Sequence, residues 1–169
     1  EQAKKIEAEK ARVQEVAKTN PDELLFKIGD ELGNMASYRT HPHRGSDWGK
    51  KAAIGGKPVK AMTNGRVKKI FWNDALGWTV TQSTGDGLYI EYSHLYPKPT
   101  IELNSLVEGG KTVLGHVGGG KVRPSGSAST GDHLHTAAAP VEFGIDVHLV
   151  DASHLVDMFK HIDANKSAV

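Results

Sequence analysis

Short β-type segments separated by glycine-bearing turns fill the middle of this 169-residue chain and limit the folds open to it. From about residue 52, runs rich in Val, Ile and aromatic residues alternate with turns, which is the pattern of a compact antiparallel β domain. The expected strands are residues 58–61, 66–72, 78–82, 88–95, 112–117 and 133–137. Asn64-Gly65 and Gly85-Asp86-Gly87 are hairpin turn signals.

Helical patterns occupy both ends of the chain. Residues 1–18 are rich in Ala, Glu and Lys with a thin apolar stripe, so we expect an exposed helix; a partner-binding amphipathic helix is the alternative. A second helix should start at Asn20-Pro21, since Asn can cap and Pro suits the first helical position.

A last helix is expected to begin near Asp151 and to place Leu155, Phe159 and Ile162 on one face. The predicted fold is therefore mainly β with peripheral helices. We divide the chain into a helical lead-in or linker (1–36), a β domain (37–150) and a C-terminal helix with its tail (151–169).

Composition excludes several classes of function. The chain carries 21 Lys and Arg against 20 Asp and Glu, so its net charge of +1 favours neither nucleic acid nor an anionic membrane surface. No apolar run approaches the roughly 20 residues that a membrane span needs. Cysteine is absent, which removes disulfides, thiolate nucleophiles and Cys-based zinc sites. No signal peptide is visible, so any secretion signal is expected to have been removed or never to have existed.

Nine histidines remain to be explained, and three stretches place them where chemistry is plausible. His43 and Asp47 flank Gly45 and are expected on a loop that folds back on itself. In strand 88–95, a period of two places His94 on the same face as Leu88, Ile90 and Tyr92.

The third stretch contains His133 and His135. If it is extended, both imidazoles face the same way, about 6.6 Å apart at the backbone, and Leu134 points into the core. Two such rings can converge on one metal, or one can bind metal while the other handles a proton. Ligation by His and a carboxylate, with one position left for water, is the pattern of catalytic zinc.

Five short motifs occur in a fixed order along residues 41–140. They are His43-x-Gly45-x-Asp47, Gly56-x-Pro58-Val59-x-Ala61, Gly65-x-Val67, Tyr92-x-His94-Leu95 and Ser129-Thr130-Gly131-x-His133-Leu134-His135. Each is weak alone, but the ordered set resembles the M23 peptidases, the lysostaphin-like zinc endopeptidases that cut peptidoglycan peptides.

The resemblance implies a role for each residue of the site. His43, Asp47 and His135 would hold one Zn²⁺ per chain, and His94 with His133 would form the catalytic pair beside it. The metal polarises a peptide carbonyl and lowers the pKa of its water towards about 7. Histidine titrates closest to neutrality, which suits proton transfer to the leaving amine.

Some residues depart from the family pattern or add to it. Asp132 replaces the usual Pro before the histidine pair, and the stretch 118–127 is longer than usual, so we expect it to wall the substrate groove. His116 is a candidate for lining that groove and His41 for supporting the metal loop. Ordinary surface or helix positions are expected for His148, His154 and His161. Core packing is the default for Trp48, Trp72 and Trp78, with a role in the groove as the alternative.

The resemblance also implies where the protein works. We expect a monomer, with no membrane span and no nucleic-acid partner, acting on peptidoglycan at the bacterial cell wall, either extracellular or delivered by a phage. It would be a lysin domain, within a longer modular protein if it is a fragment. The alternatives are a catalytically inactive M23-like module that binds wall, activates another hydrolase or serves in a virion, and an amidase using the same ligands.

Overall fold

The computed structural model describes residues 55–119, 123–126 and 133–156, together with the backbone of residues 46–48. The two helices expected in the N-terminal part of the chain, and the C-terminal tail beyond Val156, lie outside these residues.

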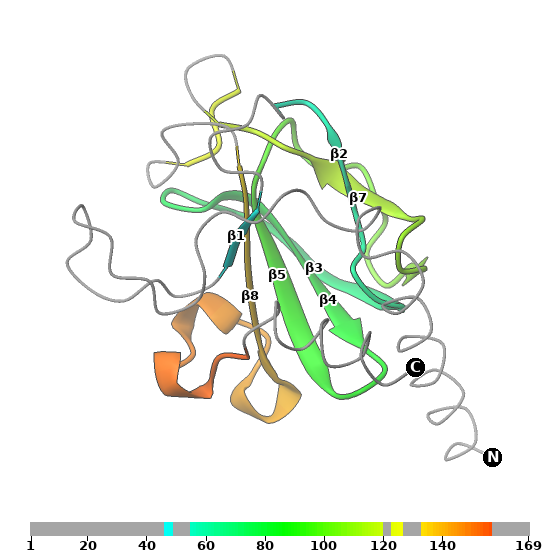
Figure 1. The fold of residues 1–169 in the computed structure, drawn as a ribbon, viewed down its shortest axis with the longest axis vertical. Helices are drawn as coiled ribbons and strands as arrows, with labels where there is room; N and C mark the ends of the chain where they lie inside the picture. The colour runs from blue at the N-terminus through cyan, green and yellow to red at the C-terminus, as the bar shows by residue number, and fades with distance from the viewer. Residues whose placement is uncertain (1–45, 49–54, 120–122, 127–132, 157–169) are drawn as a thin grey trace.

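Antiparallel sheets dominate the described structure, as expected (Figure 1). A six-stranded sheet has the order β1-β8-β5-β4-β3-β6, and a two-stranded sheet pairs β2 with β7. The strands of the large sheet are β1 (Ser46–Trp48), β3 (Gly65–Asn73), β4 (Gly77–Thr84), β5 (Leu88–Leu95), β6 (Leu106–Val107) and β8 (Leu134–Pro140). The small sheet contains β2 (Pro58–Lys60) and β7 (Val113–His116).

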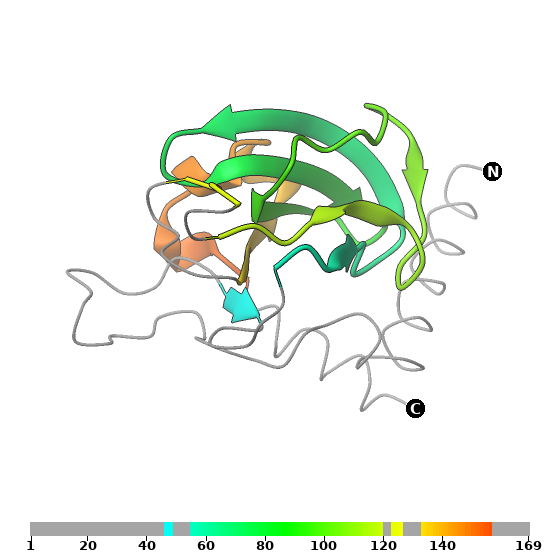
Figure 2. The same cartoon turned by 90° about the horizontal axis from the view of Figure 1, so that it is seen from above.

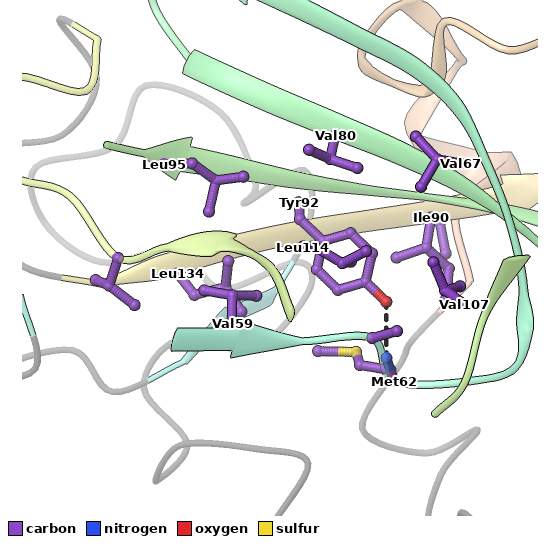
Figure 3. Packing of buried hydrophobic residues seen from close by; sticks show 13 residues of the cluster. Val59, Met62, Val67, Val80, Ile90, Tyr92, Leu95, Val107, Leu114 and Leu134 are labelled. Carbon is purple, nitrogen blue, oxygen red and sulfur yellow. Dashed lines mark hydrogen bonds between the residues drawn. The ribbon is translucent and has the colours of Figure 1, made fainter. Parts of the chain in front are cut away.

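The main core lies between the two sheets, where β2 and β7 cover one face of the curved large sheet (Figure 2). Val59 and Leu114 of the small sheet point toward Tyr92 of β5 (Figure 3), and all three are at most 1% exposed. The Tyr92 hydroxyl accepts a hydrogen bond from the backbone N–H of Met62 at 2.9 Å and donates one to Oε1 of Gln82. Burial of these apolar faces supplies the main stabilising free energy.

Three short 3₁₀ helices follow β8, η1 (Val141–Phe143), η2 (Val147–Leu149) and η3 (Ala152–His154), and η2 packs on the other face of the large sheet against β5 and β8. Ala137 and Ala139 of β8 pack there against Val147 and Val150. Of the helix expected from Asp151, the described residues up to Val156 form the single turn η3, which the Asp151 side chain caps, and Leu155 is already extended. Phe159 and Ile162 lie outside the described residues.

Two turns connect the central strands. Gly85-Asp86-Gly87 joins β4 to β5, which confirms that hairpin signal. Asn64-Gly65 does not form a hairpin, because β2 and β3 belong to different sheets. The turn from β3 to β4 is held by Asn73, whose Oδ1 accepts hydrogen bonds from the backbone N–H groups of Ala75 and Leu76.

Across the described ranges, no helix is both long enough and apolar enough to cross a lipid bilayer.

Candidate active site

The histidine pair lies at the start of β8, the strand between the edge strand β1 and β5 in the large sheet. Leu134 is 2% exposed and belongs to the main core, so it anchors the strand as predicted. His133 and His135 flank it and therefore lie on the opposite side. His133 is 8% exposed, whereas His135 is half-buried.

A β-bulge in β5 decides where His94 points. Val80 of β4 pairs with Tyr92 and Trp78 with Leu95, so two residues, Ser93 and His94, stand opposite the single residue Thr79. The extra residue returns Leu95 to the core face, where it packs with Tyr92. The prediction that His94 shares the face of Tyr92 is therefore wrong, because strict alternation ends at the bulge.

His94 adopts a backbone conformation that side chains rarely take. Its φ is 62°, in the left-handed region that disfavours residues with a Cβ. The backbone N–H of His94 donates to the carbonyl of Leu76 in the β3–β4 turn at 2.7 Å, and its own carbonyl accepts from Gly118 at 2.8 Å. These bonds hold an unfavourable conformation in place, which is a recurring feature of functional sites.

Three imidazole rings meet at this end of the sheet. The ring centroid of His94 lies 4.8 Å from that of His133 and 5.9 Å from that of His135, with an interplanar angle of 60° in both cases. The strand register brings β5 and β8 together here, since Ser93 pairs with His135. His94 thus forms one cluster of nitrogen donors with His133 and His135, which lie 39 and 41 positions further along the sequence.

A hydrogen bond to the backbone fixes the tautomer of His94. Nδ1 lies 2.8 Å from the carbonyl oxygen of Ser125. A carbonyl oxygen can only accept, so Nδ1 carries the hydrogen, and the lone pair of the neutral ring is on Nε2. His94 is 3% exposed and Ser125 is 2% exposed, so water does not compete for this bond.

The carboxylate predicted as a metal ligand comes from β1. Register places Asp47 opposite His135, the other predicted ligand described here. Asp47 was expected on a loop; it lies instead on a short strand that pairs with β8, since pairing with that strand satisfies its backbone groups. His43 and the side chain of Asp47 lie outside what the structure describes. Within the described ranges, no three His, Asp or Glu side chains are grouped as a metal site.

Other histidines differ in their surroundings. His116 is exposed on β7, and His154 is exposed and stacks on Phe143 with ring centroids 4.2 Å apart. The prediction of an ordinary position is wrong for His148, because its Nδ1 is hydrogen bonded at 2.7 Å to Oε2 of Glu91, which is 1% exposed. His41 and His161 fall outside the described residues.

Two buried groups were missed by sequence reasoning, the Ser125 carbonyl beside His94 and the Glu91 carboxyl beside His148. The Ser125 carbonyl carries no side-chain signal, although the glycine that follows it is a sign of a close backbone approach. Glu91 had a readable signal, because a charged residue alternates with apolar residues in strand β5 and therefore belongs on the other face.

The tryptophans divide between packing and exposure. Trp78 packs against the main core, and its ring meets that of Trp72 edge-on with centroids 5.6 Å apart. Trp72 is 45% exposed, and Lys98 Nζ lies 5.3 Å from the centroid of the Trp78 ring. The default of core packing thus holds for Trp78 but not for Trp72. The side chain of Trp48 is not described.

Several solved structures share this fold, and some of them are described as peptidases. The structure of LytU is 24% identical, with a TM-score of 0.63 over 82% of this chain and 86% of that one. The catalytic domain of the antimicrobial peptidase lysostaphin from Staphylococcus simulans is also 24% identical, with a TM-score of 0.61 over 82% and 92%. A zinc-containing peptidase from Vibrio cholerae is 21% identical, with a TM-score of 0.57 over 77% and 38%. These likenesses show the lysostaphin-like fold.

No curated protein matches the sequence. The family model described as "Peptidase family M23" matches residues 41–145, a range that contains all five predicted site residues. Because that match covers more than half of the 169 residues, the chain belongs to peptidase family M23.

Proposed function

We propose that this protein is a zinc-dependent endopeptidase that hydrolyses peptide bonds in bacterial peptidoglycan, in the stem peptide or the cross-bridge. The observation that carries the proposal is the convergence of the His94, His133 and His135 rings at one end of the sheet. A structural core histidine needs one hydrogen-bond partner, whereas three adjacent rings carry a desolvation cost that a site of chemistry explains.

The donor set suits zinc. His135 offers a ring nitrogen, and register places Asp47 opposite it on β1, so the two residues are direct neighbours across the strand pair. With His43 they form a set of two imidazoles and a carboxylate, which leaves one tetrahedral position open. When bound, the ion would polarise the scissile carbonyl and acidify a water molecule.

The remaining histidines would move protons. His94 has its lone pair on Nε2 because Nδ1 donates to Ser125, so Nε2 can accept a proton from the attacking water. The adjacent His133 would orient the developing oxyanion and return a proton to the leaving amine. Both rings are more than nine-tenths buried, which strengthens each of these interactions.

Membership of family M23 supports a proposal for the substrate and the place of action. Lysostaphin, which shares the fold, is described as an antimicrobial peptidase. We infer that this protein acts at the bacterial cell wall as a phage or bacterial lysin, outside the cell or delivered by a phage, and as a monomer. The rival function is an inactive M23-like module that binds wall, activates another hydrolase or serves in a virion.

Digestion of purified walls of several cross-bridge types tests the proposal. Wild type is expected to release fragments with new amino-acid termini, identified by mass spectrometry, while His135→Ala loses both lysis and bound zinc. Free lactyl groups on the sugars would identify an amidase instead. Normal wall binding without cleavage at any zinc concentration would support the inactive module, and full lysis by zinc-free His135→Ala would refute the metal mechanism.

A further inference from the structure

The hydrogen bond between His94 and Ser125 depends on close backbone packing. Ser125 and Gly126 lie against the β3–β4 turn, and a Cβ placed on Gly77 would lie well inside 3.0 Å of the Ser125 carbonyl group. A Cβ on Gly126 would come equally close to the carbonyl of Ala75 and the N–H of Gly77. Real Cβ atoms essentially never come that close, so only glycine permits this approach.

The same turn also holds the backbone of His94. Leu76, one residue before Gly77, accepts the hydrogen bond from the His94 N–H at 2.7 Å. Asn73 fixes the turn by accepting from the N–H groups of Ala75 and Leu76 at 2.9 and 3.0 Å. The turn thus holds the His94 main chain directly and the His94 ring through Ser125.

A third glycine closes the packing from the other side. Gly118 donates to the His94 carbonyl at 2.8 Å, and a Cβ on it would lie 2.8 Å from Cβ of Ser125. Ser125 therefore has almost no room to shift between Gly77 and Gly118. Its hydroxyl is buried and makes no hydrogen bond among the described residues, so the contribution of this residue to the cluster comes from its carbonyl.

From this packing we infer that Gly77 and Gly126 are positioning residues, which press the Ser125 carbonyl onto Nδ1 of His94 and so present Nε2 to the reaction. The inference rests on the proposed function, in which His94 moves a proton. It extends that function by assigning roles to residues that touch neither metal nor substrate. A wrong tautomer would put hydrogen on the nitrogen that must accept one.

Two readouts test the inference separately. Two-bond ¹H–¹⁵N correlation spectra report which nitrogen of His94 carries hydrogen, in both metal-free and zinc-supplied protein. Turnover of soluble peptidoglycan fragments reports kcat and KM. Wild type should show the Nδ1–H tautomer. Gly77→Ala should raise the Nε2–H population and lower kcat by about tenfold or more, with KM changed less than about twofold.

Matched control variants distinguish the effect of the Gly77–Ser125 contact from the effects of backbone strain and of a general loss of stability. Gly77 has a φ of +73°, and so does Gly87, at +88°, but a Cβ on Gly87 meets nothing within 4 Å. Gly87→Ala therefore carries the strain without the clash and should leave the tautomer and kcat unchanged. Gly65→Ala clashes with the backbone of Ser83, away from Ser125, and should cost stability without altering the tautomer.

The outcomes distinguish the inference from the proposed function. An Nε2–H ring in active wild type, or an unchanged tautomer in folded Gly77→Ala, overturns the positioning role alone. An inactive wild type with an Nδ1–H ring supports the contact and refutes the peptidase function. If Gly77→Ala does not fold, Gly126→Ala provides the same test from the opposite side of the contact, and the wild-type spectrum still decides whether Nδ1 carries hydrogen.

Discussion

Glu91 and His148 form a hydrogen-bonded pair across the outer face of the large sheet, with Oε2 and Nδ1 2.7 Å apart. Glu91 is 1% exposed in the middle of β5, and His148 belongs to the 3₁₀ helix η2 that covers it. The ring of His148 also lies 5.3 Å from that of Phe71, and Asp146 at the start of η2 forms an ion pair with Lys69. These contacts join η2 and the residue before it to strands β3 and β5.

Glu91 predicts how stability depends on pH. Burial raises the pKa of its carboxyl above the ordinary 4.5, and the charge of Asp146 adds to this, while His148 opposes it. The folded protein thus holds this proton more tightly than the unfolded chain. The contribution is fully present below about pH 4.5 and is lost as pH rises through the raised pKa.

We therefore expect that Glu91→Gln does not lose this stabilising free energy as the pH rises. Gln stays neutral at every pH and its side-chain oxygen can still accept a hydrogen bond from His148. Urea unfolding of the metal-free protein between pH 4.5 and pH 8 measures the effect. Glu142→Gln, at an exposed position, should keep the wild-type pH dependence. Parallel stability curves for wild type and Glu91→Gln would contradict the expectation.

His148→Ala should destabilise the protein at neutral pH. The substitution leaves the buried carboxylate of Glu91 without its partner, which costs about 1–3 kcal/mol or more for a charged group. Denaturant unfolding at pH 7.5 measures the loss. His154→Ala is the matched control, because His154 is exposed and its ring stacks on Phe143. Equal effects of the two substitutions would show that the Glu91 contact adds nothing.

Strand positions could be predicted from the sequence because period two and turn residues are local signals. Strand 88–95 was predicted with the bounds that β5 has, and the two-residue offset of His133 and His135 put both rings on one side. The side of His94 could not be predicted, since the bulge is set by pairing with Trp78 and Val80 on the neighbouring strand. The approach of Ser125 is likewise a tertiary contact.

The strand β7 illustrates the same limit. The strand pattern of the sequence predicts that Val113 is a buried residue that holds the sheet, together with Val59, Val67, Ile70, Val80 and Ile90. Four of these are at most 1% exposed and Ile70 packs against the core, but Val113 is 40% exposed and Leu114 is buried instead. The irregular pairing between Val59 and Lys60 of β2 shifts the register, and a shift of one residue exchanges the faces.

Alanine substitutions in β7 test this corrected register. Leu114 is 1% exposed in the main core, so Leu114→Ala should cost about 2–5 kcal/mol of unfolding free energy through lost burial and a cavity. Val113→Ala should stay within about 0.5 kcal/mol of wild type. Denaturant unfolding of both variants measures the difference. A larger loss of unfolding free energy for Val113→Ala than for Leu114→Ala would show that Val113, and not Leu114, faces the core.

His133 and His135 are proposed to have different roles, proton transfer for His133 and zinc binding for His135. The ring of His133 is nearer to His94 than that of His135 is, and register pairs His135 with Asp47. His135→Ala should therefore lose zinc, measured by atomic emission, and activity together. His133→Ala should retain zinc while wall digestion falls by about 10²–10⁴-fold, the range for loss of a general acid–base group. Removal of zinc by a chelator should abolish wall digestion by wild type, and added zinc should restore it. His154→Ala should match wild type in both zinc content and wall digestion. Zinc loss from His133→Ala, with zinc retained by His135→Ala, would reverse the two roles.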